Sequence, residues 1–82
     1  MMEKGEWLLG ELARHLGIPV VTLHRWRKGG WVRARKLEVG LWAVWASGTE
    51  RRRLTRLRRF QQTNPNQPIP EELTTPSVPD TK

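Results

Sequence analysis

The first apolar pattern in the chain has the spacing of an α-helix. Trp7, Leu8, Leu12 and Leu16 recur at near-helical intervals, so they share one face. Gly17 follows directly and can take the left-handed conformation in which many helices end. The pattern predicts a helix from Trp7 or Leu8 to Leu16.

A second, shorter helix is predicted two residues further on. Pro19 fits the start of a helix because its φ is already helical. Leu23 and Trp26 lie about one turn apart, so both are expected to face inward, and we interpret Trp26 as a core residue rather than a base-stacking one. This helix should run from Pro19 or Val20 to Lys28.

Two short helices joined by a tight turn have the layout of a helix-turn-helix. If Leu23 and Trp26 face the core, the opposite side of the second helix faces solvent. The residues expected to point outward are Val20, Val21, His24, Arg25 and Lys28, with Thr22 and Arg27 at the margins.

After a Gly-Gly break the apolar period changes from about four to about two. Trp31–Leu37 alternates as a strand does, with Arg33 and Arg35 on one face. A three-residue turn ending at Gly40 would lead into a return strand, Leu41–Trp45. These segments predict a two-stranded hairpin with a basic outer face.

A third helix is expected from about residue 48 to residue 62. Ser47 and Glu50 have the spacing of a capping box, in which each side chain bonds the other residue's amide. The apolar stripe is Leu54, Leu57 and Phe60, and the remaining positions are Arg51, Arg52, Arg53, Arg56, Arg58 and Arg59. The stripe is narrow, which favours packing on a small domain plus phosphate contact over lying on a membrane.

Charge divides the chain into two parts. The net charge is +7, but residues 1–62 hold fourteen Lys and Arg against five Glu, and residues 63–82 carry a slight negative excess. The second part is polar and rich in proline, so we predict one folded domain over 1–62 and a disordered or extended tail or linker over 63–82. A polyanion is the natural partner of the basic part.

Several classes of protein are disfavoured. The chain has no cysteine and two histidines without further ligands, so we expect no metal site and no cofactor. No catalytic set of side chains or phosphate-cradling loop can be assembled, so we expect neither an enzyme nor a small-molecule substrate. No apolar run is long enough to cross a bilayer and no signal peptide is visible, which predicts a cytoplasmic protein.

The segment LARHLGIPVVTLHRWRKGGWV resembles the winged helix-turn-helix of MerR-type regulators and phage excisionases, which also occurs in mobile-element recombinases and transposases. In that family a Leu-Ala start, a Leu-Gly turn and a Thr-Leu-x-x-Trp helix precede the wing. The resemblance covers about residues 7–60 and implies a mainly α fold of three helices plus a two-stranded wing. One departure is Pro19, which stands where many members place a Ser or Thr cap.

Carried over by position, the resemblance implies DNA contacts on the second helix and on the wing. The recognition-helix positions are Val21, Thr22, His24, Arg25 and Lys28, and the wing positions are Arg33, Arg35 and Lys36. Arg52 and Arg56 of the third helix are added as phosphate contacts because of that helix's charge.

We therefore expect double-stranded DNA binding by a small regulator or recombination-associated architectural factor. MerR-type regulators also carry a dimerisation helix and an effector domain, for which the chain is too short, so effector-sensing activation is not expected. Two alternatives remain open: binding of structured RNA, and an adaptor that docks on a larger recombinase. A recombinase or a second copy of the chain is the further partner considered.

Overall fold

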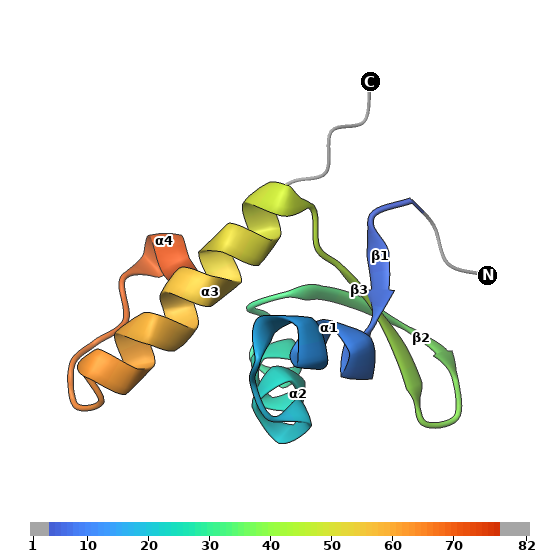
Figure 1. Ribbon diagram of the computed structural model, residues 1–82, viewed down its shortest axis with the longest axis horizontal. Coiled ribbons are helices and arrows are strands. Elements are labelled where there is room, and N and C mark those ends of the chain that lie inside the picture. The colour runs from blue at the N-terminus through green and yellow to red at the C-terminus, as the bar shows by residue number, and fades with distance from the viewer. Residues whose placement is uncertain (1–3, 78–82) are drawn as a thin grey trace.

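The computed structural model describes residues 4–77 of the chain (Figure 1). These residues fold into four helices and a three-stranded antiparallel sheet. The elements are β1 (Glu6–Leu8), α1 (Leu9–Leu16), α2 (Val20–Lys28), β2 (Arg33–Glu38), β3 (Leu41–Trp45), α3 (Gly48–Thr63) and α4 (Glu71–Thr74). The strand order is β1-β3-β2. In Figure 1, α1 and α2 lie between the hairpin of β2 and β3 on one side and the pair α3 and α4 on the other. The fold is therefore α+β, with one helix and one strand more than the sequence predicted.

The predicted hairpin is present, with a tighter turn than expected. Arg33 pairs with Trp45 and Glu38 with Leu41, so only Val39 and Gly40 remain in the turn. Gly40 has φ 80°, the positive value that such a turn needs. The expectation of a three-residue turn was wrong because Glu38 still pairs across the hairpin.

Strand β1 was not predicted. Glu6, Trp7 and Leu8 pair with Trp45, Val44 and Ala43 along the free edge of β3. Trp7 satisfies the helical spacing, yet it lies in the strand and donates from Nε1 to the carbonyl of Ala46 at 3.2 Å. Helix α1 therefore begins at Leu9, later than the predicted Trp7 or Leu8. A three-residue strand is too short to give a period, and its partner lies more than thirty residues away.

Both α1 and α2 end in the same hydrogen-bonded motif. After α1 the amides of Gly17 and Ile18 donate to the carbonyls of Arg14 and Ala13, and Gly17 has φ 72°. After α2 the amides of Gly30 and Trp31 donate to Arg27 and Trp26 in the same pattern. This is the Schellman arrangement, in which a left-handed residue turns the chain sharply and satisfies the last carbonyls. Two such turns set the directions of α2 and of the hairpin.

The core is built from the inward faces that the sequence predicted. Leu12, Leu23, Leu54 and Leu57 are fully or almost fully buried, and Trp26 is 2% exposed. The remaining members of the cluster come from α1, β3, α4 and the segments between elements, and they are Leu9, Ala13, Ile18, Val32, Val44, Ala46 and Leu73. Burial of Trp26 confirms that it packs in the core and leaves the outer side of α2 to other residues.

The capping box at the start of α3 is only half formed. The hydroxyl of Ser47 accepts from the amide of Glu50 at 3.3 Å, as predicted. Glu50 does not bond back to Ser47. Its carboxylate is fully buried and accepts from Arg53 at 2.7 and 2.8 Å and from the amide of Ser77 at 3.0 Å. A buried carboxylate gains more from a charged bidentate partner than from one amide at a helix end.

The segment after α3 folds back on the domain, so the prediction of a disordered or extended tail was wrong for residues 64–77. Leu73 of α4 is 5% exposed and packs in the core cluster. Its carbonyl accepts from Nη1 of Arg53 at 2.6 Å. The prediction failed because the side chain of Leu73 and three backbone groups of Leu73 and Ser77 anchor a stretch that has no apolar period of its own. Residues 78–82 lie outside the described part.

Candidate nucleic-acid interface

The outer side of α2 is the first part of the candidate surface. Val21, Arg25 and Lys28 are exposed, whereas Thr22 and His24 are half-buried. The arrangement follows from the inward anchors Leu23 and Trp26, which turn the other residues of this nine-residue helix outward. The structure thus brings together all five positions that the resemblance implies for this helix.

Helix α2 starts without a side-chain cap. It begins at Val20, and Pro19 is the extended residue before it, with φ −63° and ψ 144°. The carbonyl of Pro19 accepts from the amides of Thr22 and Leu23, and no side chain bonds the free amides of the first turn. The departure noted in the sequence therefore leaves this helix end uncapped by a side chain.

One arginine ties α2 to the sheet. The guanidinium carbon of Arg27 lies 3.8 Å from the ring centroid of Trp42 in β3, so the two groups stack. The Nε–H of Arg27 also donates to Nδ1 of His24 at 3.3 Å. Because Nδ1 accepts, the proton of neutral His24 must reside on Nε2. Arg27, placed only at the margin by the sequence, thus holds His24 in one tautomer.

His24 lies beside a small cavity of about 200 Å³ between α1, α2 and the hairpin turn. Its ring is neutral at neutral pH, because burial lowers the pKa of His24 below 6.5 and the charges of Arg27 and Lys28 lower it further. Among the described residues Nε2 has no hydrogen-bond partner, and no buried polar side-chain atom there lacks one, so Nε2 reaches solvent. His24 can therefore donate a hydrogen bond to an acceptor outside the protein.

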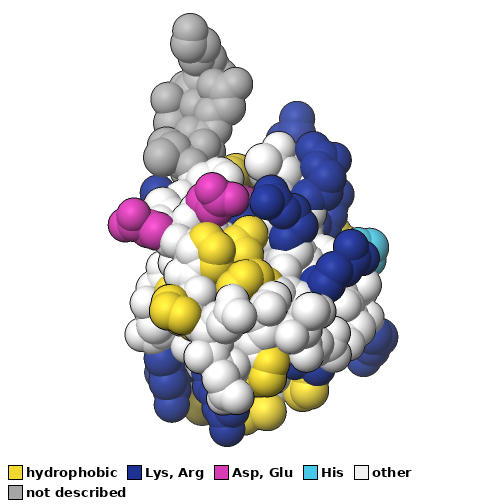
Figure 2. Space-filling view, turned by 90° about the vertical axis from the view of Figure 1, so that its left-hand side faces the viewer, with side chains coloured by type: hydrophobic (Ala, Val, Ile, Leu, Met, Phe, Trp, Pro, Cys, Tyr) yellow, Lys and Arg dark blue, Asp and Glu magenta, His cyan; other side chains and the backbone are white. Residues whose placement is uncertain are grey.

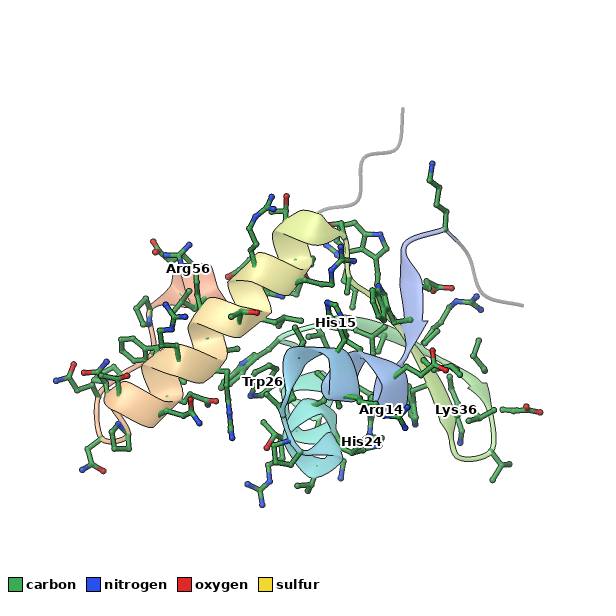
Figure 3. All side chains as sticks on the ribbon, in the orientation of Figure 1. Arg14, His15, His24, Trp26, Lys36 and Arg56 are labelled. Carbon is green, nitrogen blue, oxygen red and sulfur yellow. The ribbon has the colours of Figure 1, made fainter. Side chains whose placement is uncertain are left out.

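The three basic residues of β2 do not share one face. Arg33 and Arg35 stand opposite Trp45 and Ala43, whereas Lys36 stands opposite Trp42, so Lys36 lies on the face toward α2. Lys36 is exposed, and Figure 3 shows it on the hairpin. Of the three predicted wing residues, Lys36 is therefore the one on the side of α2.

Arg35 and Arg33 have partners within the protein. Arg35 extends from β2 to Glu6 of β1 and makes two bonds of 2.8 Å to its carboxylate. The strand between them carries Ala43, whose small side chain is fully buried at this point. Arg33 donates from Nε to the carbonyl of Ser77 at 2.9 Å. Both arginines remain exposed, so each would contact a polyanion with only part of its donor set.

Arg52 and Arg56 lie on a different part of the molecule. Both are exposed on α3, and Arg56 makes a loose 3.5 Å ion pair with Glu72 of α4. In Figure 3, Arg56 is well separated from His24 and Lys36. Figure 2, which faces the α3–α4 end, shows a row of basic side chains beside an apolar patch, with acidic side chains on its other side. The predicted interface is thus divided into an α2–hairpin surface and an α3 surface.

Arg53 is the residue that sequence reasoning misplaced. It was counted among the outward arginines of α3, but it is 7% exposed. Its guanidinium bonds Glu50, the carbonyl of Leu73 and, at 2.7 Å, the carbonyl of Trp31. The Glu50–Arg53 spacing of three residues was a visible signal for an ion pair on one side of the helix. Arg53 also precedes Leu57 by four residues and Phe60 by seven, so the helical period places it on the apolar stripe of α3.

Comparison with protein-family models, curated proteins and solved structures found no match to the chain. Within residues 4–77, no group of three His, Cys, Asp or Glu side chains is placed to hold a metal ion. No helix in the described part is long and apolar enough to cross a membrane.

Proposed function

We propose that the chain is a winged helix-turn-helix domain that binds double-stranded DNA, with α2 in the major groove and the β2–β3 hairpin as the wing. The observation that carries this proposal is the outer side of α2. Val21, Arg25 and Lys28 are exposed, and the opposite side is fixed in the core by Leu23 and Trp26. A short helix presented in this way can enter the major groove.

The side chains on this surface have the chemistry to read DNA. Arg25 can bond guanine with two donors, and Val21 can contact a thymine methyl. Neutral His24 offers one donor from Nε2, which suits a purine N7, a thymine O4 or a phosphate oxygen. Thr22 and Lys28 lie at the edges of the surface, and both residue types commonly bond DNA phosphates.

The wing would hold the flanking backbone. Lys36 lies on the side of α2, and Arg33 and Arg35 are exposed on the other face of the sheet. The role that fits is a small regulator or an architectural factor of recombination, since the domain would place basic residues on both a groove and its flanks.

The experiment is selection of bound sequences from a random DNA pool, followed by titration of the selected and a scrambled duplex at several salt concentrations. Arg25→Ala should cost about 1–3 kcal/mol on the selected duplex and reduce discrimination, whereas Arg33→Ala should weaken both duplexes alike. Equal affinity for all duplexes, unchanged in Arg25→Ala, would contradict the proposal.

The same titration addresses the alternative of RNA binding. Structured RNA at matched salt is the competitor, and a preference for RNA over the selected duplex would favour RNA binding.

The adaptor alternative placed the contact in the tail after residue 62. Residues 64–77 are bonded to α3 through Leu73 and Ser77, so this segment has an intramolecular partner already and the adaptor is the less favoured reading.

A further inference from the structure

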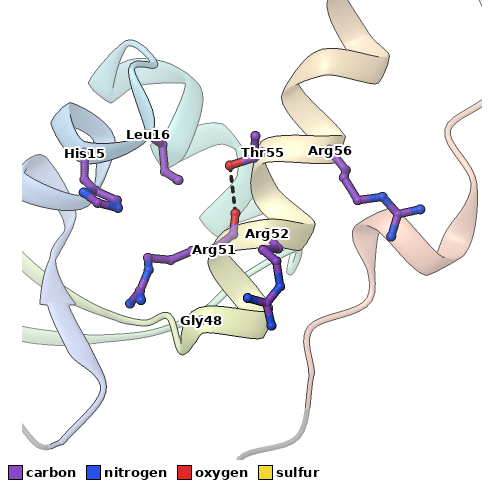
Figure 4. Close-up of a pocket in the computed structure, with 7 residues that line it drawn as sticks. All are labelled: His15, Leu16, Gly48, Arg51, Arg52, Thr55 and Arg56. Atoms are coloured by element: carbon purple, nitrogen blue, oxygen red, sulfur yellow. Dashed lines mark hydrogen bonds between the residues drawn. The ribbon is translucent and has the colours of Figure 1, made fainter.

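A basic concavity lies outside the α2 surface. It is a cleft of about 630 Å³ between the end of α1 and the N-terminal half of α3 (Figure 4). Three arginines, Arg51, Arg52 and Arg56, line it together with His15, and no carboxylate does. Arginine is charged at every physiological pH, so the cleft is a site of positive potential.

The walls of the cleft are held in place by Trp7. The guanidinium carbon of Arg51 lies 5.1 Å from the ring centroid of Trp7, and the ring of His15 lies 4.9 Å from it. Arg51 also donates from Nη1 to the carbonyl of Ala46 at 2.9 Å. One tryptophan thus positions a residue of α1 and a residue of α3, and the cationic wall exists before any ligand binds.

The remaining two arginines are available to a ligand. Arg52 is exposed and, among the described residues, makes no ion pair. The bond of Arg56 to Glu72 joins side chains that are 66% and 73% exposed at 3.5 Å. An ion pair of this kind is worth little in water and exchanges readily for a phosphate.

Helix α1 separates this cleft from the α2 surface. His15 lines the cleft, whereas Gly10 lines the small cavity beside His24. Two residues that are five positions apart on an α-helix are separated by about 140° around its axis, so Gly10 and His15 lie on opposite flanks of α1. A straight duplex seated on α2 would therefore leave the cleft uncovered.

We propose that the α1–α3 cleft binds the phosphate backbone of a second DNA segment, so that one domain holds two duplexes together. This rests on the proposed function, because the first duplex is the one at α2. Guanidinium groups bond phosphate oxygens with paired donors. An open cleft with two exposed arginines suits a polymer that passes across it rather than an enclosed small anion.

The test measures capture of a second duplex. The selected duplex is immobilised and saturated with the full chain, and a fluorescent duplex of unrelated sequence is then added at several salt concentrations. Arg52→Ala with Arg56→Ala should abolish capture at moderate salt, or lower its salt slope by about two, one for each lost phosphate contact. The matched control, Arg58→Ala with Arg59→Ala, removes the same charge from the same helix outside the cleft and should retain capture.

Three results would overturn the inference: no capture by the wild-type chain, capture retained by the Arg52, Arg56 variant, or equal loss in both double variants. Affinity for the immobilised duplex is recorded separately. If Arg25→Ala leaves that affinity and its sequence preference unchanged, the proposed function fails at α2, whatever the cleft does. Binding of an oligoglutamate peptide that depends on Arg52 and Arg56, without capture of DNA, would reject DNA in favour of an acidic protein partner.

Discussion

Arg53 and Arg25 show two opposite uses of arginine in one small domain. Arg53 is 7% exposed, and its guanidinium bonds the carboxylate of Glu50 and two carbonyls from other parts of the chain. Arg25 is exposed on α2 and, in the described part of the chain, has no side-chain partner. The first links α3 to α4 and to the start of the hairpin, and the second is available for binding.

The difference shows that a high arginine content is not itself a measure of a binding surface. Arg27, Arg33, Arg35 and Arg51 lie between the two extremes, because each is committed to a tryptophan, a carbonyl or a carboxylate. A guanidinium has five donors, so such a residue can support the fold and still contact a phosphate.

Arg53→Met tests the structural role of Arg53 and should have the largest effect on the free energy of unfolding. It leaves the buried carboxylate of Glu50 without its charged partner, which typically costs about 3–5 kcal/mol. Urea unfolding at neutral pH measures the free energy of unfolding. Arg59→Met, which alters an exposed arginine of the same helix, should change it by less than about 0.5 kcal/mol. Similar values for the two variants would show that Arg53 is not a structural link.

Acid should weaken the same link. Burial by itself raises the pKa of Glu50, but the hydrogen bonds from Arg53 and from the Ser77 amide outweigh it and hold the pKa below 4.5. A carboxyl group with a lowered folded pKa stabilises the protein above its unfolded pKa, and that contribution is lost as the pH falls through the folded value.

Unfolding measured between neutral pH and pH 3 should therefore show a steeper loss of stability in the wild type than in Glu50→Gln, which cannot titrate at this position. The variant should also be less stable at neutral pH, because Arg53 loses its counter-charge. Parallel pH profiles would mean that Glu50 titrates alike in the folded and unfolded states.

Arg27→Met tests an intermediate case. Methionine keeps an unbranched apolar stem beside Trp42 but removes the cation and the bond to His24, so we expect a loss of about 0.5–1 kcal/mol in stability. The pKa of His24 should move up toward its ordinary value, since Arg27 is one of the groups that lower it. An NMR titration of the imidazole measures this, with Arg14→Met as control. If the pKa of His24 is the same in Arg27→Met as in the wild type, Arg27 does not position the imidazole.

Arg25→Ala tests the binding end and should have the smallest effect on the fold. The free energy of unfolding should stay within about 0.5 kcal/mol of the wild type, because the side chain makes no contact that the fold requires. The same variant is the one expected to lose DNA discrimination. A large loss of stability in Arg25→Ala would erase the contrast with Arg53.

Much of the local structure could be predicted because local spacing encodes it. The turn at Gly17, the positive φ of Gly40, the inward positions of Leu23 and Trp26, and the Ser47 cap all follow from a few neighbouring residues. For the candidate surface, the same spacing gave the exposed side of α2. The alternation of a strand puts Arg35 and Lys36 on opposite faces, but it could not tell which face meets Glu6 and which lies toward α2, because that depends on how the sheet packs.

The sequence by itself therefore determined the faces of α1, α2 and α3, the hairpin and the basic character of residues 1–62. Only the tertiary structure decided that β1 closes the edge of β3, that Leu73 and Ser77 return to α3, and that Arg53 bonds the carbonyls of Trp31 and Leu73. These features join residues 20 to 39 positions apart. A periodic pattern reports which side of an element is apolar, whereas the partner that covers that side is set by how the whole chain packs.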